Sequence, residues 1–442
     1  METARAEENP DSRHAQAILP IELWETIIDA VAAESMYYAA GAYGRTYTLR
    51  SCALTCRIWT FRSLYHLNTV VTFSEESSIK RFLFRFPPPD VPVQTLSIKL
   101  PPTVSLRDSS SWVSSNLIRL KSFPKLRELA IQNFNFEYAH AQLIPRLSIS
   151  LPLSRTLRNL ILFDVIFTSA NQLNRLLRSF RQLPSIRLMD IRFPENASPL
   201  ILPVVTPHIT SKPPKDNSKT GILCIYSADY RGGTPTLPSI LTIFIHMLST
   251  TLTWLEMDEF WLSNECIPVA NNFFKSCKTL EYIQITLWLN NNNGRICHLG
   301  CFDALDLSEN KQLKIIDVGA SWHEDLLTPY ILPLSRFIGT IKSPRFYSLR
   351  LRLGFSGIEK LGDVPWNALD DVLCTDNLSG LTDVSIVVGH PNSGMNQIRD
   401  NEYITQEEFL PHVMSVTESN MPACYRKQLL RFRYHVAQWS KI

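Results

Sequence analysis

The chain has 442 residues, and its length, composition and charge exclude several classes of protein before any motif is considered. Hydrophobic residues make up 45% and charged residues 19%, so the chain can bury a large core and is not a disordered polypeptide. The net charge of +3 is too small to indicate a nucleic-acid partner. The balance of 15 Gly against 28 Pro disfavours folds that hold phosphates in glycine-rich loops.

The amino-terminal residues are polar and lack the apolar stretch of a signal peptide. We expect residues 1–16 to form a disordered tail. The nine Cys, an odd number, are then expected to be reduced thiols in a cytoplasmic or nuclear protein. The densest apolar run, residues 240–248, is too short to cross a membrane, so no membrane association is predicted.

Three short helices are predicted between residues 17 and 67. Pro20 suits the first turn of a helix, and the apolar residues that follow it recur at helical spacing as far as Val31. A second helix is predicted to begin at Thr48 as its N-cap, after a linker over residues 34–47, and a third carries Trp59. So small a module cannot bury all of this apolar surface by itself. Part of it should be left for a partner.

The sequence of this module resembles an F-box, which joins F-box proteins to the Skp-family adaptor of Skp–cullin–F-box ubiquitin ligases. The resemblance rests on a Leu-Pro start at Leu19, the Glu-Leu pair that ends at Leu23, and the Cys-x-x-Trp ending that begins at Cys56. It implies that the adaptor is contacted by Leu19, Pro20, Leu23, Ile27, Leu54, Cys56 and Trp59. The alternative is an ordinary helical bundle.

No motif in the sequence indicates catalysis or metal binding. Cys52 and Cys56 lie four residues apart on one predicted helix face, and we interpret them as small core residues because no further ligand stands at a suitable spacing. The cluster from Cys297 to Cys301 also lacks a second pair of ligands. P-loop, zinc-protease and nucleophile-elbow motifs do not occur. The sequence therefore predicts no catalytic, cofactor-binding or metal-binding residue.

From residue 93 onward one pattern, apolar-x-x-apolar-x-apolar, recurs. Copies begin at residues 93, 126, 157, 186, 252, 280, 313, 346 and 381, and a degenerate copy lies within residues 222–226. The 288 residues between the first and last starts contain nine intervals, a mean of 32. In the fourth copy the pattern selects Ile186, Met189 and Ile191. Helices are predicted between strands over residues 74–86, 171–183, 238–248 and 366–373, and a strand plus a helix at this period is typical of a solenoid.

The repeat resembles an irregular leucine-rich repeat, which implies an α/β solenoid of about ten strand–helix units over residues 68–410. Residues 194–220, rich in Pro, and residues 389–402 are predicted loops. Apolar residues from Tyr425 to Trp439 recur at helical spacing. We therefore expect residues 411–442 to be helices that cap the solenoid, although their basic edge could alternatively bind a membrane surface or an acidic partner.

Side chains that alternate with the inward apolar positions should face the open side of the sheet. Aromatic residues and Arg, which dominate protein interfaces, occur among them. The candidate target-binding face comprises Trp254, Glu256, Asp258, Tyr282, Gln284, Trp288, Asp317, Arg350 and Arg352. The alternative is that loops cover this face or that it is merely solvated.

These features together predict a non-catalytic substrate-recognition subunit of a Skp–cullin–F-box ubiquitin ligase. Its partners would be the Skp-family adaptor, through it the cullin and RING proteins, and an unidentified target protein held by the solenoid. Two alternatives remain open: a repeat scaffold outside any ligase, and an enzyme on an α/β fold. No cofactor, nucleic acid or membrane is expected.

Overall fold

The computed structural model describes most helices and strands of the chain. The described residues are 20–33, 39–86, 93–100, 123–136, 156–180, 183–194, 221–226, 236–248, 250–258, 266–288, 299–321, 327–354, 362, 364–389 and 406–434. The chain divides into two compact units, one ending at Val70 and the other beginning at Val71, and each is described by itself. The predicted tail lies outside the described residues, as do the predicted loops over 194–220 and 389–402 except for their first residues; of these, Gly389 ends a strand and was wrongly assigned to a loop.

The first unit, here called the helical module, contains α1 (Ile21–Ala33), α2 (Ala39–Thr55) and α3 (Arg57–Thr69). Ile28 of α1, Leu49 of α2 and Ser63 of α3 are its most buried residues. The prediction that the second helix begins at Thr48 was wrong, because α2 begins nine residues earlier and Thr48 lies inside it. Much of the predicted linker is therefore helical.

The second unit, here called the repeat unit, is built on a sheet of 12 strands that lie in sequence order. The neighbouring pairs from β2 to β12 are parallel, which confirms the α/β class. The strands are β1 (Val70–Phe73), β2 (Thr95–Lys99), β3 (Glu128–Asn135), β4 (Asn159–Ile166), β5 (Ser185–Arg192), β6 (Gly221–Tyr226), β7 (Leu252–Asp258), β8 (Tyr282–Trp288), β9 (Ile315–Ser321), β10 (Ser348–Gly354), β11 (Asp383–Gly389) and β12 (Leu430–Tyr434).

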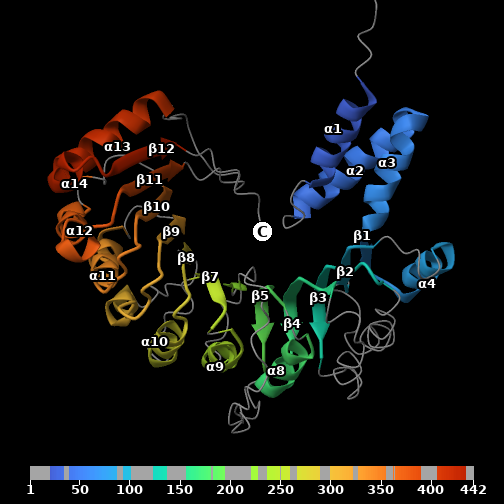
Figure 1. Cartoon of the computed structure of the whole chain (residues 1–442), viewed down its shortest axis with the longest axis horizontal. Coiled ribbons are helices and arrows are strands. Elements are labelled where there is room, and N and C mark those ends of the chain that lie inside the picture. The colour runs from blue at the N-terminus through green and yellow to red at the C-terminus, as the bar shows by residue number, and fades with distance from the viewer. Residues whose placement is uncertain are drawn as a thin grey trace, which may run out of the picture. The chain divides into compact units, whose positions relative to one another are not determined.

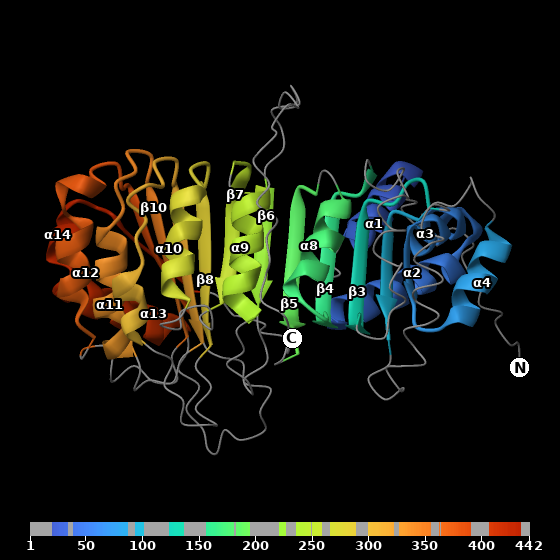
Figure 2. The ribbon, with the colours of Figure 1, turned by 90° about the horizontal axis from the view of Figure 1, so that it is seen from below.

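The described helices of the repeat unit lie along one face of this sheet (Figures 1 and 2). We call the opposite face of the sheet the strand face. The helices are α4 (Glu76–Arg85), α8 (Ala170–Ser179), α9 (Thr236–Leu248), α10 (Ile267–Ser276), α11 (Leu327–Gly339), α12 (Trp366–Leu373), α13 (Gln406–Asn420) and α14 (Pro422–Arg426). Short 3-10 helices span Leu299–Ala304 and Asp376–Leu378. Among the described residues, no helix is both long and apolar enough to cross a membrane.

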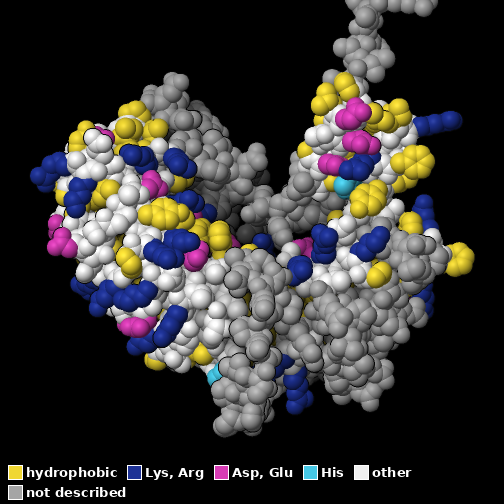
Figure 3. All heavy atoms as spheres, viewed as in Figure 1, with side chains coloured by type: hydrophobic (Ala, Val, Ile, Leu, Met, Phe, Trp, Pro, Cys, Tyr) yellow, Lys and Arg dark blue, Asp and Glu magenta, His cyan; other side chains and the backbone are white. Residues whose placement is uncertain are grey.

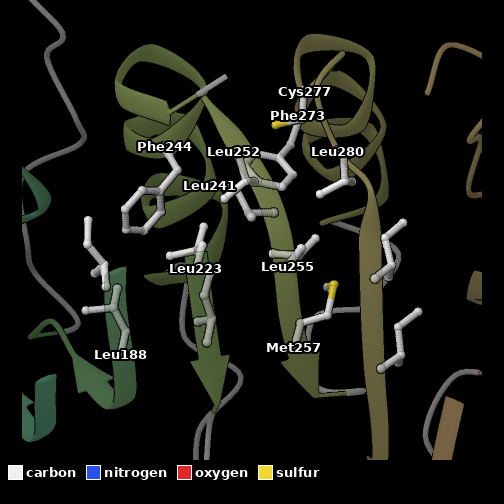
Figure 4. Close-up of a cluster of buried hydrophobic side chains, with 14 of the residues drawn as sticks. Leu188, Leu223, Leu241, Phe244, Leu252, Leu255, Met257, Phe273, Cys277 and Leu280 are labelled. Atoms are coloured by element: carbon white, nitrogen blue, oxygen red, sulfur yellow. The ribbon is translucent and has the colours of Figure 1, made fainter. Parts of the chain in front are cut away.

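The core lies between the sheet and the helices, and the strand register builds it in two apolar rows. One row joins Leu96, Leu129, Leu160, Ile186, Leu223, Leu255, Ile283, Ile316, Leu349, Val384 and Leu430. The second row lies two residues further along each strand. Figure 4 shows how side chains of α9 and α10, such as Phe244 and Phe273, pack onto these rows at Leu223 and Leu255. Each repeat therefore buries the apolar surface of its neighbours.

Two predictions about this array were wrong. In β5 the inward residues are Ile186 and Leu188, and Ile191 also packs against the core, whereas Met189, the middle residue that the pattern selected, is partly exposed. The predicted C-terminal helix is interrupted: α14 ends at Arg426, Gln428 adopts a positive φ of 56°, and β12 then pairs with β11. A strand satisfies the hydrogen-bonding edge of β11, which a helix could not do.

Three neighbouring strands share a local distortion. Asn133, Asp164 and Asp190, at corresponding positions of β3, β4 and β5, have φ values of 56°, 50° and 55°. Asn and Asp tolerate this left-handed conformation better than other residues with side chains. Beyond this point Phe136 and Phe167 stack with their ring centroids 4.6 Å apart, so the strand ends are also packed.

Candidate protein-binding surfaces

The helical module carries an exposed apolar surface. Of the fourteen large hydrophobic side chains that are exposed among the described residues, nine belong to it. We call these nine the apolar surface: Ile21, Leu23, Ile27, Tyr47, Leu54, Ile58, Phe61, Leu64 and Tyr65. Leu54 is 88% exposed and Phe61 is 83% exposed. Figure 3 shows hydrophobic side chains on the visible face of the module.

The helix periodicity explains why these side chains are exposed. Ile58, Phe61 and Tyr65 lie at i, i+3 and i+7 and form a stripe along α3. A different side of α3 packs against α1, where the ring of Trp59 lies 4.4 Å from that of Trp24. The packing within the module therefore leaves the apolar stripe of α3 uncovered.

A polar cluster fixes α1 against α3. Asp29 accepts hydrogen bonds from Nε and Nη2 of Arg62 at 2.7 and 2.5 Å, and Nε2 of His66 lies 2.7 Å from the same carboxylate. The hydrogen bond from Arg62, followed by the one from His66, lowers the pKa of Asp29 to about 2, although burial opposes this shift. The bidentate pair therefore orients the two helices that carry most of the apolar surface.

The structure places the residues predicted to contact the adaptor as follows. Leu19 lies outside the described residues. Pro20, Leu23, Ile27, Leu54 and Cys56 are exposed, whereas Trp59 is half-buried against Trp24. Sequence reasoning missed Ile58, Phe61 and Tyr65, although their spacing on α3 could have shown them.

The strand face of the repeat unit carries a polar row in which one residue from each of four neighbouring strands is in register: Cys224, Glu256, Gln284 and Asp317. Glu256 accepts hydrogen bonds from the Cys224 thiol at 3.2 Å and from Nε2 of Gln284 at 2.9 Å. Polar side chains of this row thus form hydrogen bonds with one another across neighbouring strands.

An aromatic pair adjoins the polar row. The rings of Trp254 and Tyr282 are stacked with their centroids 3.7 Å apart, and Trp254 remains 38% exposed while Tyr282 is buried. The Tyr282 hydroxyl donates to Gln284 and to Asp317, each at 3.1 Å. Trp254 therefore presents a flat apolar surface, and its orientation is fixed by stacking on the hydrogen-bonded ring of Tyr282.

At the other end of the row, Arg352 donates from Nε to Asp317 at 2.8 Å. Arg352 stands opposite Gly319 in register, and a Cβ at position 319 would lie 3.3 Å from the guanidinium of Arg352. Because Gly319 has no side chain, the side chain of Arg352 can lie over β9 and reach the buried Asp317 on that strand.

The electrostatic environment keeps the acidic hydroxyl and thiol groups of this face protonated. Burial, followed by the charge of Asp317, raises the pKa of Tyr282 above its ordinary value. Burial and the nearby Glu256 raise the pKa values of Cys224 and Tyr226 in the same way. As protonated groups, these side chains can donate hydrogen bonds on this face.

The predicted target-binding residues fall on this face in part. Trp254, Glu256, Tyr282, Gln284, Asp317, Arg350 and Arg352 lie on it together. The side chains of Asp258 and Trp288 lie outside the described residues. The sequence analysis placed Arg431 and Arg433 on the basic edge of a capping helix and not on this face, because it assigned β12 to a helix.

The structure also brings together three possible metal ligands that are far apart in sequence. The side-chain ligand atoms of Asp370, Cys374 and Cys424 lie within 4.8 Å of one another. Asp370, however, already accepts hydrogen bonds from the backbone N–H groups of Ala423 and Cys424, at 2.9 and 2.7 Å. We assign Asp370 to fixing the start of α14. The side chains of the second candidate cluster, from Cys297 to Cys301, lie outside the described residues.

Comparisons with known proteins assign no family to the chain. No protein-family model matches the sequence, and a search of curated proteins finds no match.

Proposed function

We propose that this protein is the substrate-recognition subunit of a Skp–cullin–F-box ubiquitin ligase. The helical module would bind the Skp-family adaptor, and the strand face of the repeat unit would bind a target protein. The observation that carries the proposal is the apolar surface, because soluble proteins seldom leave so many large side chains of one small module in water unless a partner covers them.

The two most exposed side chains of the apolar surface set the binding free energy that we expect from it. Burial of Leu54 or Phe61 against a partner is worth roughly 1.5–3 kcal/mol each. Asp29 and Arg62 hold α1 and α3 in a fixed arrangement, so little of this energy is lost in ordering the module.

In this proposal the chain contributes proximity and not chemistry. A target held on the repeat unit is brought to the enzyme that carries ubiquitin, which raises the effective concentration of its lysines. No residue of this chain would react. The hydrogen-bonded, protonated state of Cys224, Tyr226 and Tyr282 agrees with a binding role for the strand face.

The test is co-expression of the full chain with a Skp-family adaptor. The wild type should purify as a stoichiometric complex, and the double variant Leu54→Ser/Phe61→Ser should lose the adaptor at unchanged helix content. Phe84→Ser is the matched control, because Phe84 is 93% exposed on α4 of the repeat unit and should not affect adaptor binding. Retention of the adaptor by the double variant would contradict the proposal.

The replacement of Leu19 and Pro20 by Ala provides a second test at the start of the module. It should also abolish the complex, since the resemblance to the F-box assigns both residues to the adaptor contact. A chain that is soluble and monomeric, and that binds no adaptor, would instead support the scaffold alternative.

A further inference from the structure

Four Arg side chains lie on the strand face at one end of the repeat unit. Arg350 and Arg352 belong to β10, and Arg431 and Arg433 belong to β12. The residues that alternate with them on these strands pack toward the core, so the four Arg project from the opposite face. We call these four residues the arginine patch.

The strand register sets the spacing of the patch. Arg350 and Arg431 flank Ser385 in one row, and Arg352 and Arg433 flank Val387 in the next. Adjacent strands are about 4.8 Å apart, so the two columns lie about 10 Å apart, and the two rows lie about 7 Å apart. The small, buried Ser385 forms part of the floor between the columns.

Among the described residues, two carboxylates on the strand face lie near the four Arg: Asp317, which pairs with Arg352, and Asp383, which accepts from the Ser348 hydroxyl. Arg352 pairs with Asp317, while Arg350 and Arg433 are exposed and form no ion pair with any described residue. Nη2 of Arg352 is buried, so Arg352 is less accessible to a ligand than the exposed Arg350, Arg431 and Arg433. Within the described part of the chain, Arg431 donates to the backbone oxygens of Gln428 and Leu430 and to no carboxylate. Guanidinium groups therefore remain available for an anionic ligand.

We propose that the arginine patch binds a short acidic segment of the target protein, through carboxylate or phosphate groups. This inference rests on the proposed function and names the class of target. A polyproline II segment rises about 3.1 Å per residue with three residues per turn, so its side chains at i and i+3 share one face about 9 Å apart. That spacing matches the distance between the two columns of the patch.

The test uses three fluorescein-labelled peptides of equal length and the full chain. One peptide carries Glu at every third position, the second carries phosphoserine there, and the third carries Gln. Either anionic peptide should bind in a salt-dependent way, and the Gln peptide should bind at least ~10-fold more weakly. Whether Glu or phosphoserine binds more tightly distinguishes an acidic target from a phosphorylated one.

Two matched variants locate the site. Arg350→Gln/Arg433→Gln should weaken binding of the anionic peptides at least ~10-fold, because each lost charged hydrogen bond has a large effect. Arg175→Gln/Arg178→Gln removes the same charge from exposed positions of α8 and should leave binding unchanged. An equal effect of both pairs, absence of saturable binding below about 1 mM, or tighter binding of a DNA duplex would overturn the proposal.

Adaptor binding separates this proposal from the previous one. Arg350→Gln/Arg433→Gln should still purify with the Skp-family adaptor, whereas Leu54→Ser/Phe61→Ser should still bind the peptide. Loss of adaptor binding by the second variant together with failure of every peptide would leave the ligase assignment in place and refute the acidic target.

Discussion

Nε of Arg352 donates to Oδ1 of Asp317 across two adjacent strands, and the side chain of Asp317 is only 8% exposed. The pair thus joins β9 to β10 at the point where the polar row meets the arginine patch. Replacement of Arg352 by Met leaves a buried carboxylate with one remaining donor, the Tyr282 hydroxyl. We expect the free energy of unfolding to fall by about 1–3 kcal/mol.

The matched control for this prediction is Arg350→Met on the same strand. Arg350 is exposed and has no ion-pair partner among the described residues, so its loss should change stability by less than about 0.5 kcal/mol. Urea denaturation followed by far-UV circular dichroism measures the free energy of unfolding of both variants. Equal midpoints for the two variants would show that the Asp317 pair does not stabilise the sheet.

The stability of the helical module should depend on pH through Asp29. The pKa of Asp29 falls from its ordinary 3.8 to about 2 in the folded state. The stabilisation is therefore complete above about pH 5 and is lost progressively as the pH falls to about 1, below both pKa values. Because the carboxylate is partly exposed, its contribution should not exceed about 1 kcal/mol.

The comparison of wild type with Asp29→Asn tests this dependence. At pH 5 to 7 the wild type should protect the amides of α1 and α3 better against hydrogen exchange, after correction for the intrinsic rate. Near pH 1, below both pKa values, the difference should vanish. A difference that persists there would assign the effect to packing and not to charge.

Asp370 should stabilise the C-terminal end of the repeat unit. Its carboxylate accepts from the N–H groups of Ala423 and Cys424, so Asp370→Ala leaves both amides without these acceptors. The cost should be about 1–2 kcal/mol, as for other lost helix caps. Hydrogen exchange of the α14 amides should quicken, whereas Asp371→Ala at the exposed neighbouring position should have no effect.

Gly221 should not tolerate a side chain. A Cβ at this position would lie 2.8 Å from the carbonyl oxygen of Thr251, which is backbone and cannot move aside cheaply. Gly221→Ala should lower the free energy of unfolding by about 1–3 kcal/mol. Gly362→Ala is the control, since its Cβ would meet nothing within 4 Å, and thermal denaturation should separate the two variants.

The sequence predicted most of the strand register because buried apolar positions recur with a fixed spacing. It failed in β5, where the pattern selected Met189 in place of Leu188. The positive φ of Asp190 marks an irregularity after which Ile191 pairs with Val165 and packs against the core. It failed again at β12, where Leu430 and Phe432 fit both a helix and a strand. Pairing with β11 decided that choice, and no local pattern contains this information.

The candidate surfaces could be predicted less completely. Leu54, which the F-box resemblance assigns to the adaptor contact, is exposed, whereas Phe61 was assigned to no binding surface although its helical spacing with Ile58 and Tyr65 could have shown one. To predict the polar row from Cys224 to Asp317, the register of four strands must be known, because its members are about thirty residues apart in sequence. Long-range contacts of this kind follow from packing and not from spacing.

β12 is the last strand in the order of the described sheet, and Arg431 and Arg433 lie along it. Exposed edge strands invite the addition of a strand from another molecule, which is a common route to fibrous aggregates. Two like charges on so short a strand would repel the same segment of a second copy. The charges of β12 would therefore disfavour edge-to-edge pairing of two copies of the chain.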